Sequence, residues 1–161
     1  MMNTSDILSN KPFNYQDISI DKVSVGDDYM KVDFKKIEEI YVIGKAEKID
    51  LLKKYEQLKF FKGYIHIKEG LSIEIDCSKI KSLRLRDKYL HLTKLKTRKE
   101  IEREFGKADY LLTDGIMWVF DYVVDAKVLV YKKLKLYLHI DPETDNLKEI
   151  RFGDIDEQYY D

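Results

Sequence analysis

The clearest pattern in the chain is the alternation of hydrophobic and polar residues, which predicts β-strands. Residues 64–92 show it repeatedly: Ile65 and Ile67 are separated by a polar residue, residues 71–76 alternate after a Glu-Gly turn, and residues 83–86 alternate leucine with arginine. Hydrophobic side chains at every second position are typical of an antiparallel sheet with one buried face and one face in solvent.

The second half of the chain continues this pattern. Residues 116–123 are hydrophobic on both faces, which predicts a central strand. Residues 128–140 keep one alternating phase apart from Lys132, and after a turn at 142–146 hydrophobic positions resume at 147–152. A sheet therefore accounts for most of the chain.

Two segments favour short helices. Residues 46–59 are rich in helix-forming residues, and Leu51, Tyr55 and Leu58 fall on one face, with Gly63 as the expected stop. The second helix is marked by its ends. Residues 97–100, Thr-Arg-Lys-Glu, match a capping box, in which the Thr side chain and the Glu side chain satisfy each other's backbone N–H groups.

This capping box predicts a helix over 98–105. Ile101 and Phe105 would share its buried face, and Gly106 would end it in the left-handed conformation that glycine adopts at little cost. A helix this short is not stable alone, so it must pack on the sheet. Residues 28–42 leave strand and helix both open, because positions 30–34 alternate while the isoleucines that follow also fit a helical spacing.

The two halves of the chain contain similar sequence segments. Pairs of similar segments recur at offsets of 65, 67 and 62 residues: 71–76 with 136–141, 80–87 with 147–154, and 44–47 with 106–109. Near-constant offsets favour two copies of one α/β unit, at 15–92 and 93–161, with coincidence as the alternative.

Residues 1–14, rich in Asn, Ser and Thr, predict a flexible arm before a single globular domain at 15–161. The predicted fold class is α+β: a mostly antiparallel sheet with two or three short helices packed on one face.

Composition limits the classes of function. The chain has 161 residues, with 29 Lys and Arg against 30 Asp and Glu, so its net charge of −1 argues against a dedicated nucleic-acid binder. The basic residues between 79 and 99 are then read as the solvated face of strands. A lone cysteine forms no internal disulfide, and neither a signal peptide nor an apolar run of about 20 residues is present, which predicts a cytoplasmic protein outside the membrane.

Candidate catalytic chemistry is sparse. The histidines are His66, His91 and His139; the last shares a strand face with Asp141, but two ligands do not make a metal site. Cys77 follows an aspartate, which disfavours a reactive thiolate. No nucleophile elbow, Walker A or dinucleotide-binding motif occurs. We therefore expect no catalytic residue, no metal and no cofactor.

The acidic end of the chain is the candidate binding segment. It combines carboxylates, which complement a cationic partner, with tyrosines, which are favoured interface anchors; a frayed polar terminus is the alternative. With two residues of a preceding strand, the expected partner-binding set is Tyr137, His139, Asp154, Asp156, Glu157, Tyr159, Tyr160 and Asp161.

A family resemblance rests on residues 23–27, Val-Ser-Val-Gly-Asp, and on residues 95–101 with 105–109, Phe-Gly-Lys-Ala-Asp. These look like the repeating pattern of tandem α/β proteins related to β-lactamase-inhibitor protein, in which a short helix starting at Thr or Ser ends in a Gly motif before an antiparallel hairpin. The chain lacks the usual proline after that glycine and the inhibitor's secretion signal and disulfides. Size, composition and lack of a catalytic motif are similar to bacterial toxin-immunity proteins. The resemblance implies a fold analogy.

The leading hypothesis is a protein-binding module, an intracellular immunity protein that neutralises a cognate bacterial toxin by occluding it, acting as a monomer or homodimer. One alternative is a small enzyme in which His139, Asp141 or His91 performs acid–base chemistry. Another is a structural module that forms homodimers through a sheet edge.

Overall fold

The fold is built on one eight-stranded antiparallel sheet. The computed structural model describes residues 6–9, 12–45, 48–119 and 122–155. The strands lie in the order β1-β2-β3-β4-β8-β7-β6-β5. Their bounds are β1 Ile37–Val42, β2 Lys62–Ile67, β3 Leu71–Asp76, β4 Lys79–Arg86, β5 Tyr110–Val119, β6 Tyr122–Tyr131, β7 Leu136–Ile140 and β8 Leu147–Gly153.

The helices are few and short. The two α-helices are α1 Leu51–Gln57 and α2 Arg98–Phe105. Five 3₁₀ turns join the larger elements: η1 Tyr15–Asp17, η2 Tyr29–Lys31, η3 Phe34–Lys36, η4 Asp87–Leu92 and η5 Lys132–Leu134. The predicted α+β class, a mostly antiparallel sheet with a few short helices, is confirmed.

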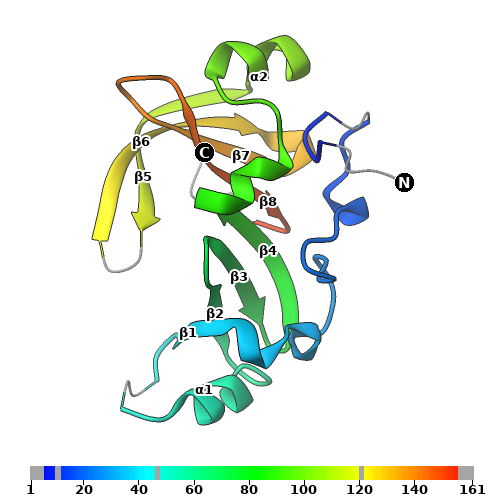
Figure 1. Cartoon of the computed structure of the whole chain (residues 1–161), viewed down its shortest axis with the longest axis vertical. Helices are drawn as coiled ribbons and strands as arrows, with labels where there is room; N and C mark the ends of the chain where they lie inside the picture. The colour runs from blue at the N-terminus through cyan, green and yellow to red at the C-terminus, as the bar shows by residue number, and fades with distance from the viewer. Residues whose placement is uncertain (1–5, 10–11, 46–47, 120–121, 156–161) are drawn as a thin grey trace.

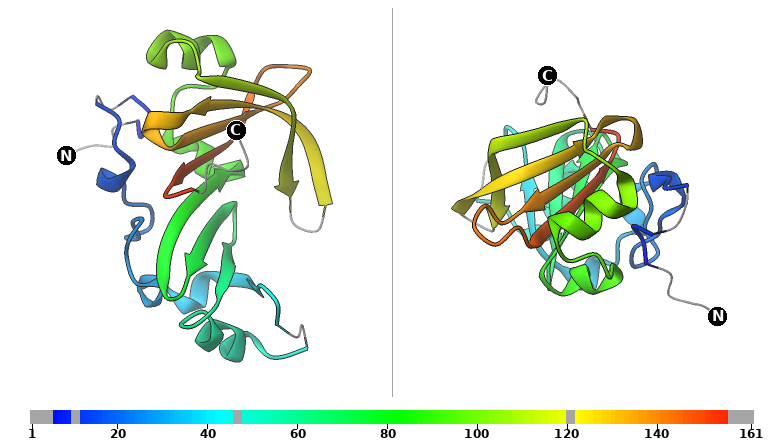
Figure 2. Two further views of the ribbon diagram at one scale, coloured as in Figure 1. Left: turned by 180° about the vertical axis from the view of Figure 1, so that it is seen from behind. Right: turned by 90° about the horizontal axis from the view of Figure 1, so that it is seen from above.

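The sheet is strongly curved, and the helices lie on its outer side (Figures 1 and 2). The N-terminal segment runs along the same side, from the level of α2 down to α1 (Figure 1). The hydrophobic core fills the space between this cover and the sheet. Leu58 at the end of α1 and Ile101 of α2 are fully buried there, together with Ile73, Leu83 and Ile150 from the central strands. This burial is what holds such short helices in place.

Helix α2 matches its sequence prediction in bounds and in caps. The Thr97 hydroxyl accepts from the Glu100 backbone N–H at 3.3 Å, and the Glu100 carboxylate accepts from the Thr97 N–H at 3.1 Å. Gly106 ends the helix at φ 80°, and its N–H donates to the Glu102 carbonyl at 2.8 Å. The Tyr131 hydroxyl of β6 donates to the Gly106 carbonyl at 2.8 Å, which ties this end of α2 to the sheet.

Helix α1 is shorter than the predicted 46–59, and the expected stop at Gly63 is wrong. The helix begins after Asp50, whose carboxylate accepts from the Lys53 N–H at 2.8 Å. Gly63 belongs to β2, where it pairs with β1 and β3. A Cβ at this position would lie 2.4 Å from the Tyr41 carbonyl oxygen and 2.6 Å from a methyl of Leu58. Glycine stands here because the backbone approaches its neighbours closely, not because a helix ends.

The open choice over residues 28–42 resolves into three pieces. Asp28 and Asp33 cap the successive 3₁₀ turns η2 and η3, each accepting a hydrogen bond from the N–H two residues ahead. Strand β1 then begins at Ile37. Residues 87–92, expected to continue the strands, form the 3₁₀ turn η4 instead.

The hydrophobic segment 116–123 does not form a central strand, so that prediction is wrong. It lies in the β5–β6 hairpin, and β5 pairs with β6 alone at the edge of the sheet.

The two halves of the chain occupy the two halves of the sheet. Strands β1–β4 form one half, β5–β8 form the other, and β4 pairs with β8 at the seam. The similar segments 71–76 and 136–141 are β3 and the region of β7, which flank the seam on either side. The third pair is not equivalent in position: Gly44 precedes α1, whereas Gly106 follows α2.

The described part of residues 1–14 packs against the fold. Leu8 is fully buried, and the Ile7 N–H donates to the Leu92 carbonyl at 3.0 Å. Phe13 contacts the rings of Phe105 and Phe152 edge-on. In the part of the chain that the structure describes, no helix is long and apolar enough to cross a membrane.

Candidate binding face

The sheet face opposite the core carries polar side chains across five neighbouring strands. Alternation within each strand and the register between strands place them together. We call this set the polar face; its members are Tyr64, His66, Ser72, Glu74, Ser82, Arg84, Arg86, Tyr137, His139, Glu149 and Arg151. Because the helices cover the outer side of the curved sheet, the polar face lies on its inner side (Figure 1).

The expectation that this face is solvated is wrong at its centre. Ser72, Ser82, His139 and Glu149 are at most 4% exposed, and Arg86 is only 7% exposed. On the inner side of a curved sheet, side chains from adjacent strands converge and cover one another. The alternation of arginine with leucine in β4 correctly separates two faces, but it does not reveal that both are covered.

Glu149 is the centre of a buried polar network. Its Oε1 lies 3.5 Å from Arg86 Nε, and its Oε2 lies 3.3 Å from His139 Nδ1. Arg86 extends the network, since its Nη2 donates to the Ser72 hydroxyl at 2.8 Å. That hydroxyl is also 2.8 Å from His66 Nδ1. The network thus links β2, β3, β4, β8 and β7.

Both histidines of the polar face are neutral at neutral pH. Burial, followed by the charges of Arg84 and Arg151, lowers the pKa of His139 to about 3. Burial, followed by Arg86 and Arg84, lowers the pKa of His66 to about 4. Groups with such values are poorly matched to proton transfer near pH 7, which favours pKa values close to the working pH. Burial raises the pKa of Glu149, against the attraction of the neighbouring arginines.

A second carboxylate, Glu74, is held by two partners. It accepts from the Ser82 hydroxyl at 2.6 Å and from Arg151 Nη2 at 3.3 Å. Arg84 lies between these groups without such a partner. Its Nε is buried with no hydrogen bond, and no hydrogen bond or ion pair of its guanidinium occurs among the described residues.

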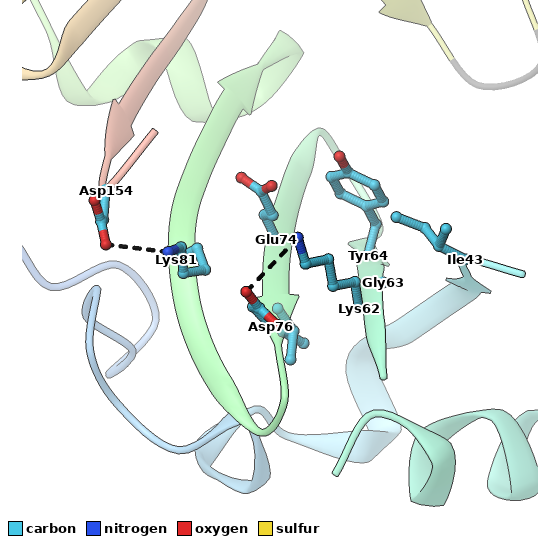
Figure 3. Close-up of a pocket in the computed structure, with 9 residues that line it drawn as sticks. Ile43, Lys62, Gly63, Tyr64, Glu74, Asp76, Lys81 and Asp154 are labelled. Atoms are coloured by element: carbon cyan, nitrogen blue, oxygen red, sulfur yellow. Dashed lines mark hydrogen bonds and ion pairs between the residues drawn. The ribbon is translucent and has the colours of Figure 1, made fainter. Parts of the chain in front are cut away.

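A hollow of about 300 Å³ opens beside this cluster (Figure 3). Two ion pairs cross its lining: Lys81 to Asp154 at 3.1 Å, and Lys62 to Asp76 at 3.9 Å. Its lining residues are Ile43, Lys62, Gly63, Tyr64, Glu74, Ile75, Asp76, Lys81 and Asp154. Tyr64 and Glu74 belong to both the hollow and the polar face, so the two are continuous.

Exposed hydrophobic side chains border the hollow. Ile43, which lines it, is 45% exposed. Tyr41 stands opposite Tyr64 in the register of β1 and β2 and is 50% exposed. Tyrosines with a free surface next to a polar depression are typical anchors of protein interfaces.

The residues expected to bind a partner are not gathered in one place. Tyr137 and His139 are buried within the polar face. Asp154 is exposed and pairs with Lys81 at the hollow. The remaining five, Asp156, Glu157, Tyr159, Tyr160 and Asp161, lie outside the described residues.

The structure gives His139 a different carboxylate neighbour from the Asp141 suggested by spacing. A register irregularity follows His139 in the β7–β8 pairing, and the Asp141 carboxylate accepts from the N–H groups of Glu143 and Thr144 in the turn. Glu149, its actual neighbour, is missed by sequence reasoning because the contact depends on strand pairing. His91 is exposed and contacts the Lys88 carbonyl.

Cys77 is exposed, and its thiol donates to the Phe60 carbonyl at 3.4 Å. The hydrogen bond with Asp76 raises the pKa of this thiol, so the thiolate is disfavoured as expected. Within the described ranges, no cluster of three or more His, Cys, Asp or Glu side chains is arranged to hold a metal ion.

No protein-family model, no curated protein and no solved structure matches the chain.

Proposed function

We propose that this chain is a protein-binding module, an intracellular immunity protein that neutralises a cognate bacterial toxin by occluding its active site or substrate path. The observation that carries the proposal is the polar face with its hollow and exposed rim. Arginine and tyrosine are enriched at protein interfaces, and they line this one side of the sheet. A rigid antiparallel sheet presents the exposed side chains at the border of the hollow, Tyr41 and Ile43, with little entropy loss on binding.

The acid–base alternative has weaker support. Its best candidate, His139, is buried and has a pKa of about 3, and among the described residues the exposed His91 has a backbone carbonyl as its hydrogen-bonding neighbour. A general base needs a suitable pKa and access to substrate, and His139 has neither. Binding of a protein partner by the polar face requires no proton transfer.

The homodimer alternative rests on the sheet edges. Strand β1 pairs with β2 alone, so its outer edge is free to pair with another strand. Measuring the mass of the purified chain in solution over a range of concentrations tests this alternative. A stable dimer together with no captured toxin would favour it over toxin binding.

The direct test is capture of a partner from the native host with the tagged chain. Tyr41→Ala removes an exposed rim side chain, and Met30→Ala, 59% exposed on the outer side, is the matched control. We expect a toxin domain to be captured by the parent and by Met30→Ala, and its affinity to fall about tenfold in Tyr41→Ala. Recovery of only a metabolite or a nucleic acid would overturn the proposal, as would a captured toxin that stays fully active when bound.

A further inference from the structure

Two arginines face each other across the seam of the sheet. Arg84 of β4 is paired directly with Arg151 of β8. Like charges placed opposite each other on antiparallel strands are destabilising. Each Nε is also buried without a hydrogen-bond partner. Folding alone does not favour this arrangement, which points to a ligand.

The charges around this pair do not balance. Three arginines, Arg84, Arg86 and Arg151, meet two carboxylates, Glu74 and Glu149. Each carboxylate already has an arginine: Glu74 has Arg151 at 3.3 Å, and Glu149 has Arg86 at 3.5 Å. The histidines are neutral and add no charge. Among the described side chains of the polar face, positive charges therefore exceed negative charges by one, and Arg84, which Glu149 and Glu74 also attract, makes no ion pair among them.

The buried arginine pair is costly in the absence of a ligand. Burial, followed by the like charge of Arg151, lowers the pKa of Arg84, against the attraction of Glu149 and Glu74. A partly buried guanidinium whose Nε is unbonded lacks the hydrogen bonds that compensate for its desolvation. An incoming anion would supply them.

We propose that Arg84, with Arg151 beside it, is a binding site for a carboxylate that the protein partner presents on an Asp or Glu side chain. This inference rests on the proposed function, since it specifies the chemistry of the partner. A carboxylate carries one negative charge and matches the guanidinium in a bidentate, planar geometry. A phosphate dianion would bring a second negative charge next to Glu74 and Glu149.

The hollow provides the approach. Glu74, which contacts Arg151, is 28% exposed on its side chain and lines the hollow. Arg84 follows Ser82 on the same face of β4, and Ser82 is paired with Glu74. A partner side chain entering over β3 from the hollow would thus reach Arg84 next to the carboxylate that is already held.

The first experiment uses acetate as the probe and needs no partner. The arginine Nε–Hε signals of the purified chain are followed by NMR during titration with acetate, with chloride at equal ionic strength as the blank. We expect the Arg84 signal to shift in the parent. The Arg98 signal is the internal control, because its Nε is occupied by Glu102 at 2.6 Å. A parallel titration uses inorganic phosphate.

The outcomes separate clearly. Saturating shifts at Arg84 with acetate, absent in the Arg84→Met variant, support the site. The Arg98 signal will begin to move at some high acetate concentration. If the Arg84 signal has not shifted by that concentration, the proposed site is wrong. Phosphate binding at least tenfold tighter than acetate also overturns it, because the ligand would then be a phosphate compound.

Two further measurements on Arg84→Met distinguish this site from a structural role and from the proposed function. Removing an uncompensated charge leaves the melting temperature equal or higher, whereas a fall of many degrees would mean that Arg84 serves folding. Affinity for a captured toxin should drop about ten- to a hundredfold. Unchanged affinity would refute the carboxylate site while the immunity function stands, and acetate binding without any protein partner would refute the immunity function alone.

Discussion

Acid should weaken this fold well above the pH at which carboxylates titrate, because two histidines are held neutral in the polar face. Their pKa values are about 4 for His66 and about 3 for His139, against about 6.5 in an unfolded chain. Between these values the unfolded state binds protons that the folded state does not. The free energy of unfolding therefore falls as pH drops below about 6.5, and it is independent of these groups above that pH.

The magnitude follows from the size of the interval. Each histidine contributes about 1.4 kcal/mol per pH unit, so lowering the pH from 6.5 to 5 costs about 4 kcal/mol for the pair. Glu149 acts in the opposite sense, because its raised pKa makes the folded state take up a proton first. It offsets part of this loss over the same interval, so the net loss is smaller than about 4 kcal/mol.

The assay is urea unfolding followed by circular dichroism at pH 7, 6 and 5. The parent should lose stability at each step toward pH 5, by up to about 4 kcal/mol in all. The double variant His66→Gln/His139→Gln should lose this pH dependence whatever its stability at pH 7. His91→Gln, at an exposed histidine, is the control and should keep it. Equal stability of the parent at pH 7 and pH 5, or an unchanged slope in the double variant, would refute the reasoning.

Three substitutions test the packing that supports the face. Thr97→Ala removes the α2 cap and should cost about 1 kcal/mol, read as a lower melting temperature, while Lys99→Ala on the exposed side of that helix should change it little. Tyr131→Phe removes the hydrogen bond to the Gly106 carbonyl and should cost about 1 kcal/mol in urea unfolding; no change would mean that water replaces it. Gly63→Ala places a methyl 2.4 Å from a backbone oxygen and should cost about 3 kcal/mol, which normal yield and stability would contradict.

Local signals in the sequence predicted the elements whose causes are local. The bounds and caps of α2 follow from Thr97, Glu100 and Gly106, which act within a few residues of one another. The strands β2, β3 and β4 follow from period-two alternation. Gly63 misled the prediction, because a glycine required by close backbone approach has the same letter as one that ends a helix.

The candidate site was predicted only in part. Two members of the polar face, Tyr137 and His139, were singled out, but as surface residues rather than buried ones. Glu149 was missed because its contacts with Arg86 and His139 join β8 to β4 and β7, strands far apart along the chain.

By itself, the sequence determined the class of the fold, the alternation that separates two sheet faces, and the ends of α2. Tertiary structure alone decided that the centre of the polar face is buried, that Arg84 stands opposite Arg151, and that β4 and β8 meet at the seam. The reason is physical: periodicity and capping act over a few residues, whereas strand register and sheet curvature depend on pairings between distant segments. Those pairings also bring Glu74, which lines the hollow, next to Ser82 and Arg151.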